Sequence, residues 1–221
     1  MARLRFLLVL DFEATCDDTT TVIPRGQSEI IELPTLLYDL EQDKVTATFH
    51  EYVRPVHHPT LTPFCTNLTG IEQTTVDSSE TFPPVWKRFL EFLREHGVLE
   101  HPEAATFLTC GDWDLKTMLP QQLRSSDLPM DWPEPGKVGA AVVTGAASGL
   151  PPPFDRWINI KKEYRELYGL RSAQGMDKML RHAGMKLEGR HHSGIDDCKN
   201  ILRLVQRMRA DGWKPQPALP R

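Results

Sequence analysis

The stretch FLLVLDFEAT at residues 6–15 decides the fold of this chain. Five consecutive apolar residues predict a strand that is buried on both faces of a sheet. Asp11 and Glu13 follow directly, and side chains alternate along a strand, so we expect both acids to project from the same face at its end. The alternative is a strand that simply stops in a polar turn. The acidic pair alone does not decide between them.

Apolar runs and alternation outside this stretch predict the rest of an α/β domain. Further strands are predicted at 29–40, 45–53 and 105–110, and helices at 84–96, through 115–119, and at 157–168, 175–182 and 195–208. The first three strands are consecutive, which favours a meander. Strands followed by helices then predict a mixed sheet with helices packed on it.

Length and composition indicate one folded unit. The chain has 221 residues, 40% hydrophobic and 25% charged, which suits a single domain with a real core. We assign residues 1–213 to that domain. Of the 21 residues in 133–153, 14 are Pro, Gly, Ala or Ser, so this segment is predicted to be an inserted surface loop that overhangs a substrate channel or merely decorates the surface. Residues 214–221, with three prolines, are predicted to be a tail.

Cysteine spacing and hydropathy favour an intracellular protein. The four cysteines are far apart and form no C-x-x-C pair, which argues against a structural zinc site or a disulfide framework. The apolar run at 6–10 is too short for a signal peptide. No stretch approaches the roughly 18 apolar residues of a membrane span. We therefore expect a location in the cytoplasm or the nucleus and no membrane partner, whereas protein partners stay unknown.

Charge is unevenly distributed along the chain. Residues 155–221 hold 15 Lys and Arg against 8 Asp and Glu, whereas residues 1–154 hold 11 against 22, within a total net charge of −4. The whole chain is thus no polycation, and any nucleic-acid site must be local. The basic last third either faces phosphate groups or consists of helices with solvated Lys and Arg faces.

Further acids sit at the edges of other apolar elements. Asp114 follows the strand predicted at 105–110, and Asp197 lies near the start of the last helix. Together with Asp11 and Glu13 they would form a carboxylate cluster, and carboxylates in one place repel unless cations compensate. Magnesium prefers oxygen ligands and completes its shell with water and phosphate oxygens. Two such ions suit the in-line hydrolysis of a phosphodiester.

A histidine near the last acid offers a general base. His192 lies five residues before Asp197, and an imidazole with a pKa near 6.5 can accept a proton from water at neutral pH. The neighbouring His191 offers the same chemistry. Spacing alone therefore leaves either histidine as the base.

These motifs carry a resemblance to a known family. The order DFEAT at 11–15, WD at 113–114 and HSGIDD at 192–197 resembles the DEDDh superfamily of 3′-to-5′ exonucleases, which implies a ribonuclease H-like mixed β-sheet flanked by α-helices. Four longer motifs resemble a narrower family, the "enhanced RNAi" exoribonuclease family, or histone-mRNA 3′-end exonuclease-like family. These motifs are LTPFCTNLTGI at 61–71, CGDWD at 110–114, WINIKK at 157–162 and GIDDCKN at 194–200. The resemblance covers about residues 5–213 without the insertion.

The resemblance implies a role for each acid and for the histidine. Asp11, Glu13 and Asp197 are expected to hold a first Mg²⁺, with Asp11 and Asp114 holding a second and Mn²⁺ as a substitute. Glu13 and His192 are the expected catalytic residues, with His192 as the base. Where the family commonly has proline before the base, this chain has a histidine, which leaves the assignment slightly open.

A nucleotide pocket is implied as well. Trp113 is either an aromatic platform for the terminal base or a core residue beside Asp114. Asp112 and Asp196 do not match the family positions, so neither is expected to carry the chemistry. The residues expected to meet the terminal nucleotide are Glu13, the backbone of Ala14, Leu68, Thr69, Ile71, Trp113 and His192.

The resulting functional hypothesis is a magnesium-dependent 3′-to-5′ exoribonuclease. It would release 5′ mononucleotides from the free 3′ hydroxyl end of mainly single-stranded RNA. One alternative is a nuclease that acts on DNA, since the sequence does not show contacts to the 2′ hydroxyl. Another is a catalytically silent RNA-binding module on the same fold. All five catalytic positions are filled, which argues against the silent module.

Overall fold

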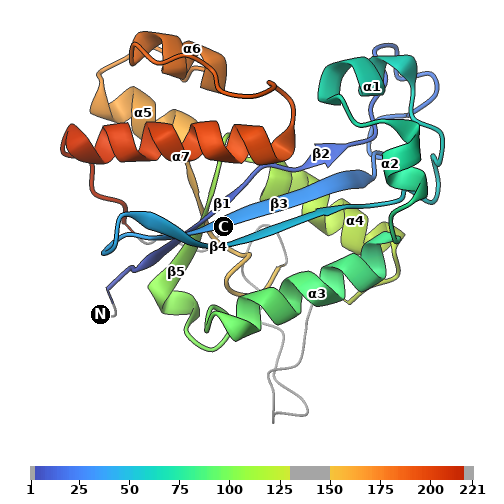
Figure 1. Cartoon of the computed structure of the whole chain (residues 1–221), viewed down its shortest axis with the longest axis horizontal. Helices are drawn as coiled ribbons and strands as arrows, with labels where there is room; N and C mark the ends of the chain where they lie inside the picture. The colour runs from blue at the N-terminus through green and yellow to red at the C-terminus, as the bar shows by residue number, and fades with distance from the viewer. Residues whose placement is uncertain (1–2, 130–149, 217–221) are drawn as a thin grey trace.

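The computed structural model describes residues 3–129 and 150–216, which form a mixed sheet covered by helices on both faces (Figure 1). The strands run in the order β2-β3-β1-β5-β6, and β4 pairs with β3 along Glu32–Asp39, on the edge of β3 opposite to β1 and β2. Pairing is antiparallel for β1–β3 and β3–β4, and parallel for β1–β5 and β5–β6. The strands are β1 (Phe6–Leu10), β2 (Glu13–Ala14), β3 (Ile30–Asp39), β4 (Lys44–Tyr52), β5 (Ala105–Thr109) and β6 (Trp157–Asn159). The predicted fold class is confirmed, and so is the antiparallel succession of the first three predicted strands.

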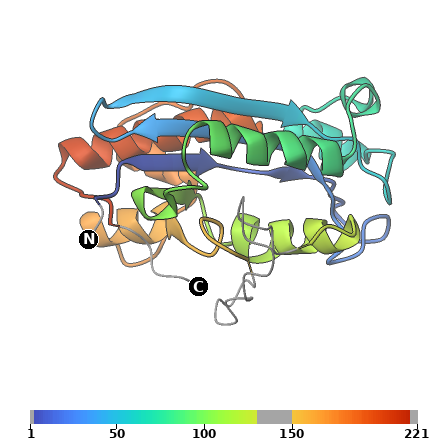
Figure 2. The same ribbon diagram turned by 90° about the horizontal axis from the view of Figure 1, so that it is seen from below.

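Most of the helices form two layers, one on each face of the sheet, whereas α1 (Pro63–Thr69) and α2 (Gln73–Asp77) lie at the end of the sheet near β2 (Figure 1). Figure 2, seen from the side of α3, has α3 in front of the sheet and α7 behind it. A 3₁₀ turn at Pro102–Ala104 precedes β5, and a π-helical turn at Asp114–Met118 follows it. The α-helices are α1 (Pro63–Thr69), α2 (Gln73–Asp77), α3 (Phe82–Glu95), α4 (Leu119–Ser125), α5 (Ile160–Leu167), α6 (Met176–His182) and α7 (Gly194–Ala210).

Alternation along β1 divides the core in two. Leu8 and Leu10 pack with the apolar faces of α3 and α4, whereas Leu7 and Val9 pack with α5, α6 and α7. All of these side chains are buried, as expected for a central strand with a helical layer on each face. The continuous apolar run at 6–10 is thus explained by a strand that meets no solvent on either side.

Two elements differ from the sequence-based expectation. Trp157–Asn159, predicted as the first turn of a helix, is strand β6, and the helix begins only at Ile160. The Asn159 side chain caps that helix by accepting a hydrogen bond from the Lys161 backbone N–H at 3.1 Å. Glu13 also lies beyond β1, on the separate short strand β2 that pairs with β3. Periodicity does not resolve strands of two or three residues, and β2, α1 and α2 were not predicted.

The predicted inserted loop is only partly within the described residues. Residues 130–149 lie outside them, as do residues 217–221 of the predicted tail. Leu150 is 3% exposed and joins the core cluster of α3, so the end of the segment predicted as a surface loop is packed. Its apolar side chain explains the difference from its Pro- and Gly-rich neighbours. Within residues 3–129 and 150–216, no helix has both the length and the hydropathy needed to cross a membrane.

Candidate active site

A cavity of about 730 Å³ opens where β1 and β5 end beside the first turn of α7. Because β1 and β5 run parallel, the segments that follow them emerge at the same edge of the sheet. All of the predicted acids and the predicted base line this cavity: Asp11, Glu13, Asp114, Asp197 and His192. The fold therefore brings together five residues from three separate segments of the sequence, 11–13, 114 and 192–197.

Asp114 is tied to the segment after β1. Its Oδ1 accepts a hydrogen bond from the Phe12 backbone N–H at 3.0 Å, across 102 positions of sequence. Asp114 also opens the π-helical turn, an irregularity that is frequent at functional sites. This bond fixes Asp114 relative to the two acids that flank Phe12.

Asp197 and His192 are joined on the other side of the cavity. The His192 backbone N–H donates to Asp197 Oδ2 at 3.0 Å. His192 has a φ of 64°, a left-handed conformation that is uncommon for residues other than glycine. Asp197 Oδ1 is buried and has no hydrogen-bond partner among the described residues. A buried carboxylate oxygen of this kind suits a cation.

The first turn of α7 lies directly against the segment that follows β1 and carries Asp11. A Cβ atom on Gly194 would be 2.6 Å from the Asp11 carbonyl oxygen and 2.9 Å from Pro34 Cγ. Only glycine fits such a close approach of two backbones. This contact places Asp197, on the same turn, next to Asp11.

The donor set fits a divalent cation. Asp11, Glu13 and Asp197 each offer an oxygen, and these atoms lie within 4.8 Å of one another. Hard oxygen donors of this kind are those that Mg²⁺ takes. Possible ligand atoms also lie within 4.8 Å of one another in a second group, which consists of His191, His192 and Asp197. The expected first metal position is therefore compatible with the geometry.

Burial raises the pKa of every acid in the cluster, and repulsion from other acids of the cluster raises the pKa of Asp11 and Glu13 further. The pKa of Asp11 lies well above its usual value because of burial and then because of Asp114 and Asp197. Burial, followed by the Glu32 charge, raises the pKa of Glu13 to about 9. Burial is also the main cause that raises the pKa of Asp197 to about 7 and that of Asp114 to about 6. A cation would relieve this repulsion.

His192 is suited to accept a proton. Burial lowers its pKa, and the neighbouring His191 and Arg190 lower it further. A lowered pKa keeps the imidazole neutral at pH 7, the form that acts as a base. The rings of His191 and His192 stack with centroids 4.0 Å apart, and both residues line the cavity. Geometry thus leaves both histidines within reach of a substrate.

The residues predicted to meet a nucleotide divide into two groups. Trp113 is 45% exposed and lines the cavity, so the hypothesis of a core tryptophan is wrong. Ala14 and Leu68 line the cavity as well. Thr69 and Ile71 are instead buried; the Thr69 hydroxyl donates to the Cys65 carbonyl oxygen at 2.9 Å, and Ile71 packs in a small apolar cluster.

The two acids expected to be uninvolved form structural contacts. Asp112 accepts hydrogen bonds from Trp157 Nε1 at 2.9 Å and from Lys162 Nζ at 2.8 Å. Asp196 accepts from the Arg190 backbone N–H at 3.0 Å and from Lys199 Nζ at 3.0 Å. These partners lie on β6, on α5, on α7 and in the segment before α7, and neither acid lines the cavity.

Lys161 is a cavity residue that the sequence analysis missed. It lines the same cavity and lowers the pKa of Asp11 and Asp114, although burial outweighs it in both. It was missed because residues 157–168 were predicted as one helix, which left its place at the head of α5 unrecognised. The WINIKK motif at 157–162 was the available signal.

Comparisons with known proteins identify the family to which the chain belongs. A family model described as Exonuclease matches residues 8–205. ERI1 exoribonuclease 3 of Homo sapiens is 40% identical over 212 residues, which cover 96% of this chain and 56% of that protein. The 3'-5' exoribonuclease 1 of Homo sapiens is 36% identical over 210 residues, covering 94% of this chain and 53% of that protein. The chain thus spans about half the length of these curated relatives.

A solved structure extends the likeness to the whole fold. The nuclease domain of 3'hExo, described as a DEDDh family member bound to rAMP, superposes with a TM-score of 0.80 at 32% identity and covers 100% of both chains. This likeness places the fold in the DEDDh class of exonucleases. Within that class, the chain belongs to the ERI1-like exonuclease family.

Proposed function

We propose that this protein is a magnesium-dependent 3′-to-5′ exoribonuclease that releases 5′ mononucleotides from a free 3′ hydroxyl end. The observation that carries the proposal is the convergence of Asp11, Glu13, Asp114 and Asp197 with His192 in one cavity. The relatives above, which are named exoribonucleases, support the choice of reaction.

The acids of the cavity would hold two cations. Asp11, Glu13 and Asp197 would ligate the first, and Asp11 and Asp114 the second. Two Mg²⁺ ions, with Mn²⁺ as a substitute, would activate the attacking water and stabilise the leaving oxygen when bound. The raised pKa values of these acids support the proposal, because the cluster is poorly stable as a set of uncompensated charges.

His192 would take the proton from the attacking water on an imidazole nitrogen. Its lowered pKa favours the neutral ring that this step needs. Glu13 would act both as a metal ligand and as a contact to the terminal nucleotide. The bond that breaks joins the last phosphate to the 3′ oxygen of the preceding nucleotide, which leaves as the new 3′ hydroxyl end.

The remaining cavity residues would bind the terminal nucleotide. The exposed ring of Trp113 offers a surface on which a base can stack. Leu68, His192 and the backbone of Ala14 would line the rest of the pocket, and Thr69 and Ile71, which are buried, would meet the nucleotide only through this segment. Lys161 and Lys178, which also line the cavity, would attract the phosphate backbone.

RNA is the proposed substrate in preference to DNA. Two solved relatives support this choice: the 3'hExo nuclease domain bound to rAMP, and a structure described as 3'-end specific recognition of histone mRNA stem-loop by 3'-exonuclease. The second superposes with a TM-score of 0.80 at 32% identity, over 97% of this chain and 66% of that one.

A labelled-strand assay tests the function. The protein is incubated with a 5′-labelled single-stranded RNA bearing a 3′ hydroxyl, with Mg²⁺ or with EDTA, beside DNA of the same sequence. We expect a magnesium-dependent ladder that shortens from the 3′ end on RNA. Faster shortening of DNA would replace the RNA assignment with DNA. Binding of RNA that EDTA does not diminish, without cleavage of either strand, would indicate a silent binding module.

A further inference from the structure

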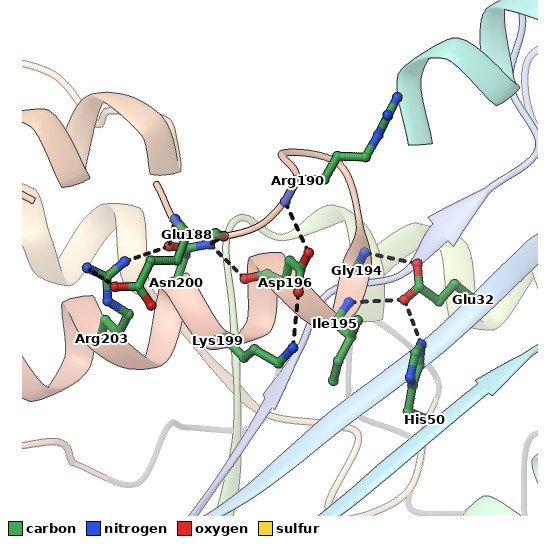
Figure 3. A network of polar contacts seen from close by, with 10 residues as sticks. All are labelled: Glu32, His50, Glu188, Arg190, Gly194, Ile195, Asp196, Lys199, Asn200 and Arg203. Atoms are coloured by element: carbon green, nitrogen blue, oxygen red, sulfur yellow. Dashed lines mark hydrogen bonds and ion pairs between the residues drawn. The ribbon is translucent and has the colours of Figure 1, made fainter. Parts of the chain in front are cut away.

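Glu32 is a completely buried carboxylate beside the metal-site acids, yet it does not line the cavity. It lies on β3, where it pairs in register with Glu13 of β2, and it is 0% exposed. Both of its oxygens are used on α7: Oε2 accepts from the Gly194 backbone N–H at 2.9 Å, and Oε1 accepts from the Ile195 backbone N–H at 3.0 Å (Figure 3). His50 of β4 contacts Oε1 through Nε2 at 2.8 Å.

Glu32 supplies the cap that the helix does not supply for itself. Ser193 is the N-cap residue of α7, but its side chain makes no capping hydrogen bond among the described residues. The first backbone N–H groups of a helix need acceptors, which a local Ser, Thr, Asp or Asn usually provides. In α7 the acceptor comes from a strand 162 positions earlier in the sequence.

Helix capping alone is a weak reason for burying this carboxylate. Removing a charge from water is costly, and stability would be served as well by a local neutral cap. Glu32 also adds negative charge beside the acids, because it raises the pKa of Glu13 and of Asp197. A cap that spans the sheet does something that a local cap does not: it fixes where α7 begins relative to β2 and β3.

That position decides the geometry of the metal site. Gly194 touches Glu32 on one side and approaches the Asp11 carbonyl oxygen on the other. Asp197 belongs to the same turn, since its backbone N–H donates to the Ser193 carbonyl oxygen at 2.8 Å. The contacts of Glu32 therefore run from β3, through the start of α7, to the acid that completes the first metal position.

We propose that Glu32 is a positioning residue of the metal centre, which holds Asp197 at the correct distance from Asp11 and Glu13 by clamping the start of α7, with His50 orienting its carboxylate. The inference rests on the proposed function only in taking these three acids as the metal ligands. Glu32 itself touches neither the metal nor the RNA.

The test compares Glu32→Gln with a matched control, Glu29→Gln. Glu29 is equally buried, at 3% exposure, and accepts backbone hydrogen bonds from Val56 at 2.7 Å and from His57 and His58 at 2.8 Å, away from α7. Mn²⁺ binding is measured by calorimetry and by electron paramagnetic resonance at a temperature where circular dichroism shows both variants folded. Steady-state cleavage of RNA gives kcat and KM separately.

We expect Glu32→Gln to weaken Mn²⁺ binding about 10-fold, at the lower end of the 10- to 100-fold losses seen when partners behind metal ligands are removed. The kcat should fall with it, whereas the KM for RNA should stay within about twofold. Glu29→Gln should lose thermal stability but keep its Mn²⁺ affinity. A Glu32→Gln protein that matches Glu29→Gln in Mn²⁺ affinity would overturn the proposal, since Glu32 would then only stabilise the fold.

A second variant covers the case in which Glu32→Gln does not fold. His50→Leu leaves the carboxylate in place but removes the contact that orients it, and His50 is partly exposed and so tolerates change better. It should weaken Mn²⁺ binding in the same direction and by less; unchanged binding in this variant would then overturn the proposal. Metal binding is measured without RNA, so a wild-type protein that binds Mn²⁺ but cleaves nothing would contradict the proposed function and leave the role of Glu32 intact.

Discussion

Asp11 is the acid that both expected metal positions share, so its substitution separates metal chemistry from folding. Removing a residue that only supports a metal ligand typically costs up to about 100-fold in activity. Asp11→Asn removes an expected ligand itself, so it should reduce magnesium-dependent cleavage by more than about 100-fold. Thermal stability should be unchanged or higher, because the variant removes one charge from a repelling cluster. Cleavage assays and thermal unfolding check both parts. Cleavage near the wild-type rate would contradict the two-metal assignment.

The two adjacent histidines can be separated by the same assay. His192→Ala should lower kcat by about 10²- to 10⁴-fold, the usual contribution of a general base. His191→Ala is the control, because it removes a stacked neighbour and leaves the His192 ring in place. A larger loss in His191→Ala would move the base by one residue. Measuring kcat at saturating RNA keeps binding effects out of the comparison.

The candidate site was largely predictable at this scale because its residues lie in short motifs at the edges of apolar elements. Asp11, Glu13, Asp114, Asp197 and His192 all reach the same cavity. Glu32 was not predictable in the same way. It lies inside the apolar run IIELP at 30–34, and its role depends on a pairing across the sheet that no local pattern encodes.

At the scale of elements, long apolar runs were predictable and short elements were not. The strands β1, β3, β4 and β5 and the helix α7 agree with their expected positions to within a few residues. The strand β6 has three residues and continues directly into α5, so apolar residues at 157–160 suit either structure. Its identity depends on parallel pairing with β5, which is a tertiary contact.

The start of α7 offers a test of how tightly elements are packed at the site. Gly194→Ala should lower the free energy of unfolding by about 1–3 kcal/mol, as overpacking does, because the new Cβ would meet the Asp11 carbonyl oxygen. Gly175→Ala at the start of α6 is the control, since no atom lies within 4 Å of its Cβ position. Denaturant unfolding measures both. Equal stabilities of the two variants would show that α7 can shift freely.

The segment before β6 offers a second test at this scale. Phe154 is 0% exposed, and its ring lies 4.9 Å from that of Phe107 and 5.2 Å from that of Trp86. Phe154→Ala should cost about 3–5 kcal/mol of unfolding free energy, as large core truncations do. Chemical denaturation checks this value. A loss below about 1 kcal/mol would mean that the predicted surface loop extends through Phe154 after all.

For the molecule as a whole, the acid cluster predicts an unusual dependence of stability on pH. Asp197 and Glu13 have folded-state pKa values of about 7 and about 9, above their ordinary values of 3.8 and 4.5. The folded state therefore binds more protons than the unfolded state across this range, so the free energy of unfolding should fall as pH rises from about 4 to 9.

Divalent metal should reverse that dependence. Under the proposed function, Mg²⁺ would bind the deprotonated carboxylates of the folded state, so its stabilising effect should grow as pH rises. Thermal unfolding in EDTA and in Mg²⁺, at several pH values, measures both slopes. Asp11→Asn provides the control, since it should flatten the slope in EDTA. Stability in EDTA that rises between pH 5 and 8 would contradict the clustering of the acids.

The acids of the candidate metal site lie far apart in the sequence, and this has a consequence for timing during synthesis. Asp11 leaves the ribosome first, and Asp197 at the start of α7 follows it by 186 positions (197 minus 11). At about 5–20 residues per second, roughly 10 to 40 s separate these two acids. Throughout that interval the nascent protein holds Asp11, Glu13 and later Asp114 but lacks the last acid of the candidate site. The candidate site can thus be completed only after the start of α7 has been synthesised, long after its first two acids.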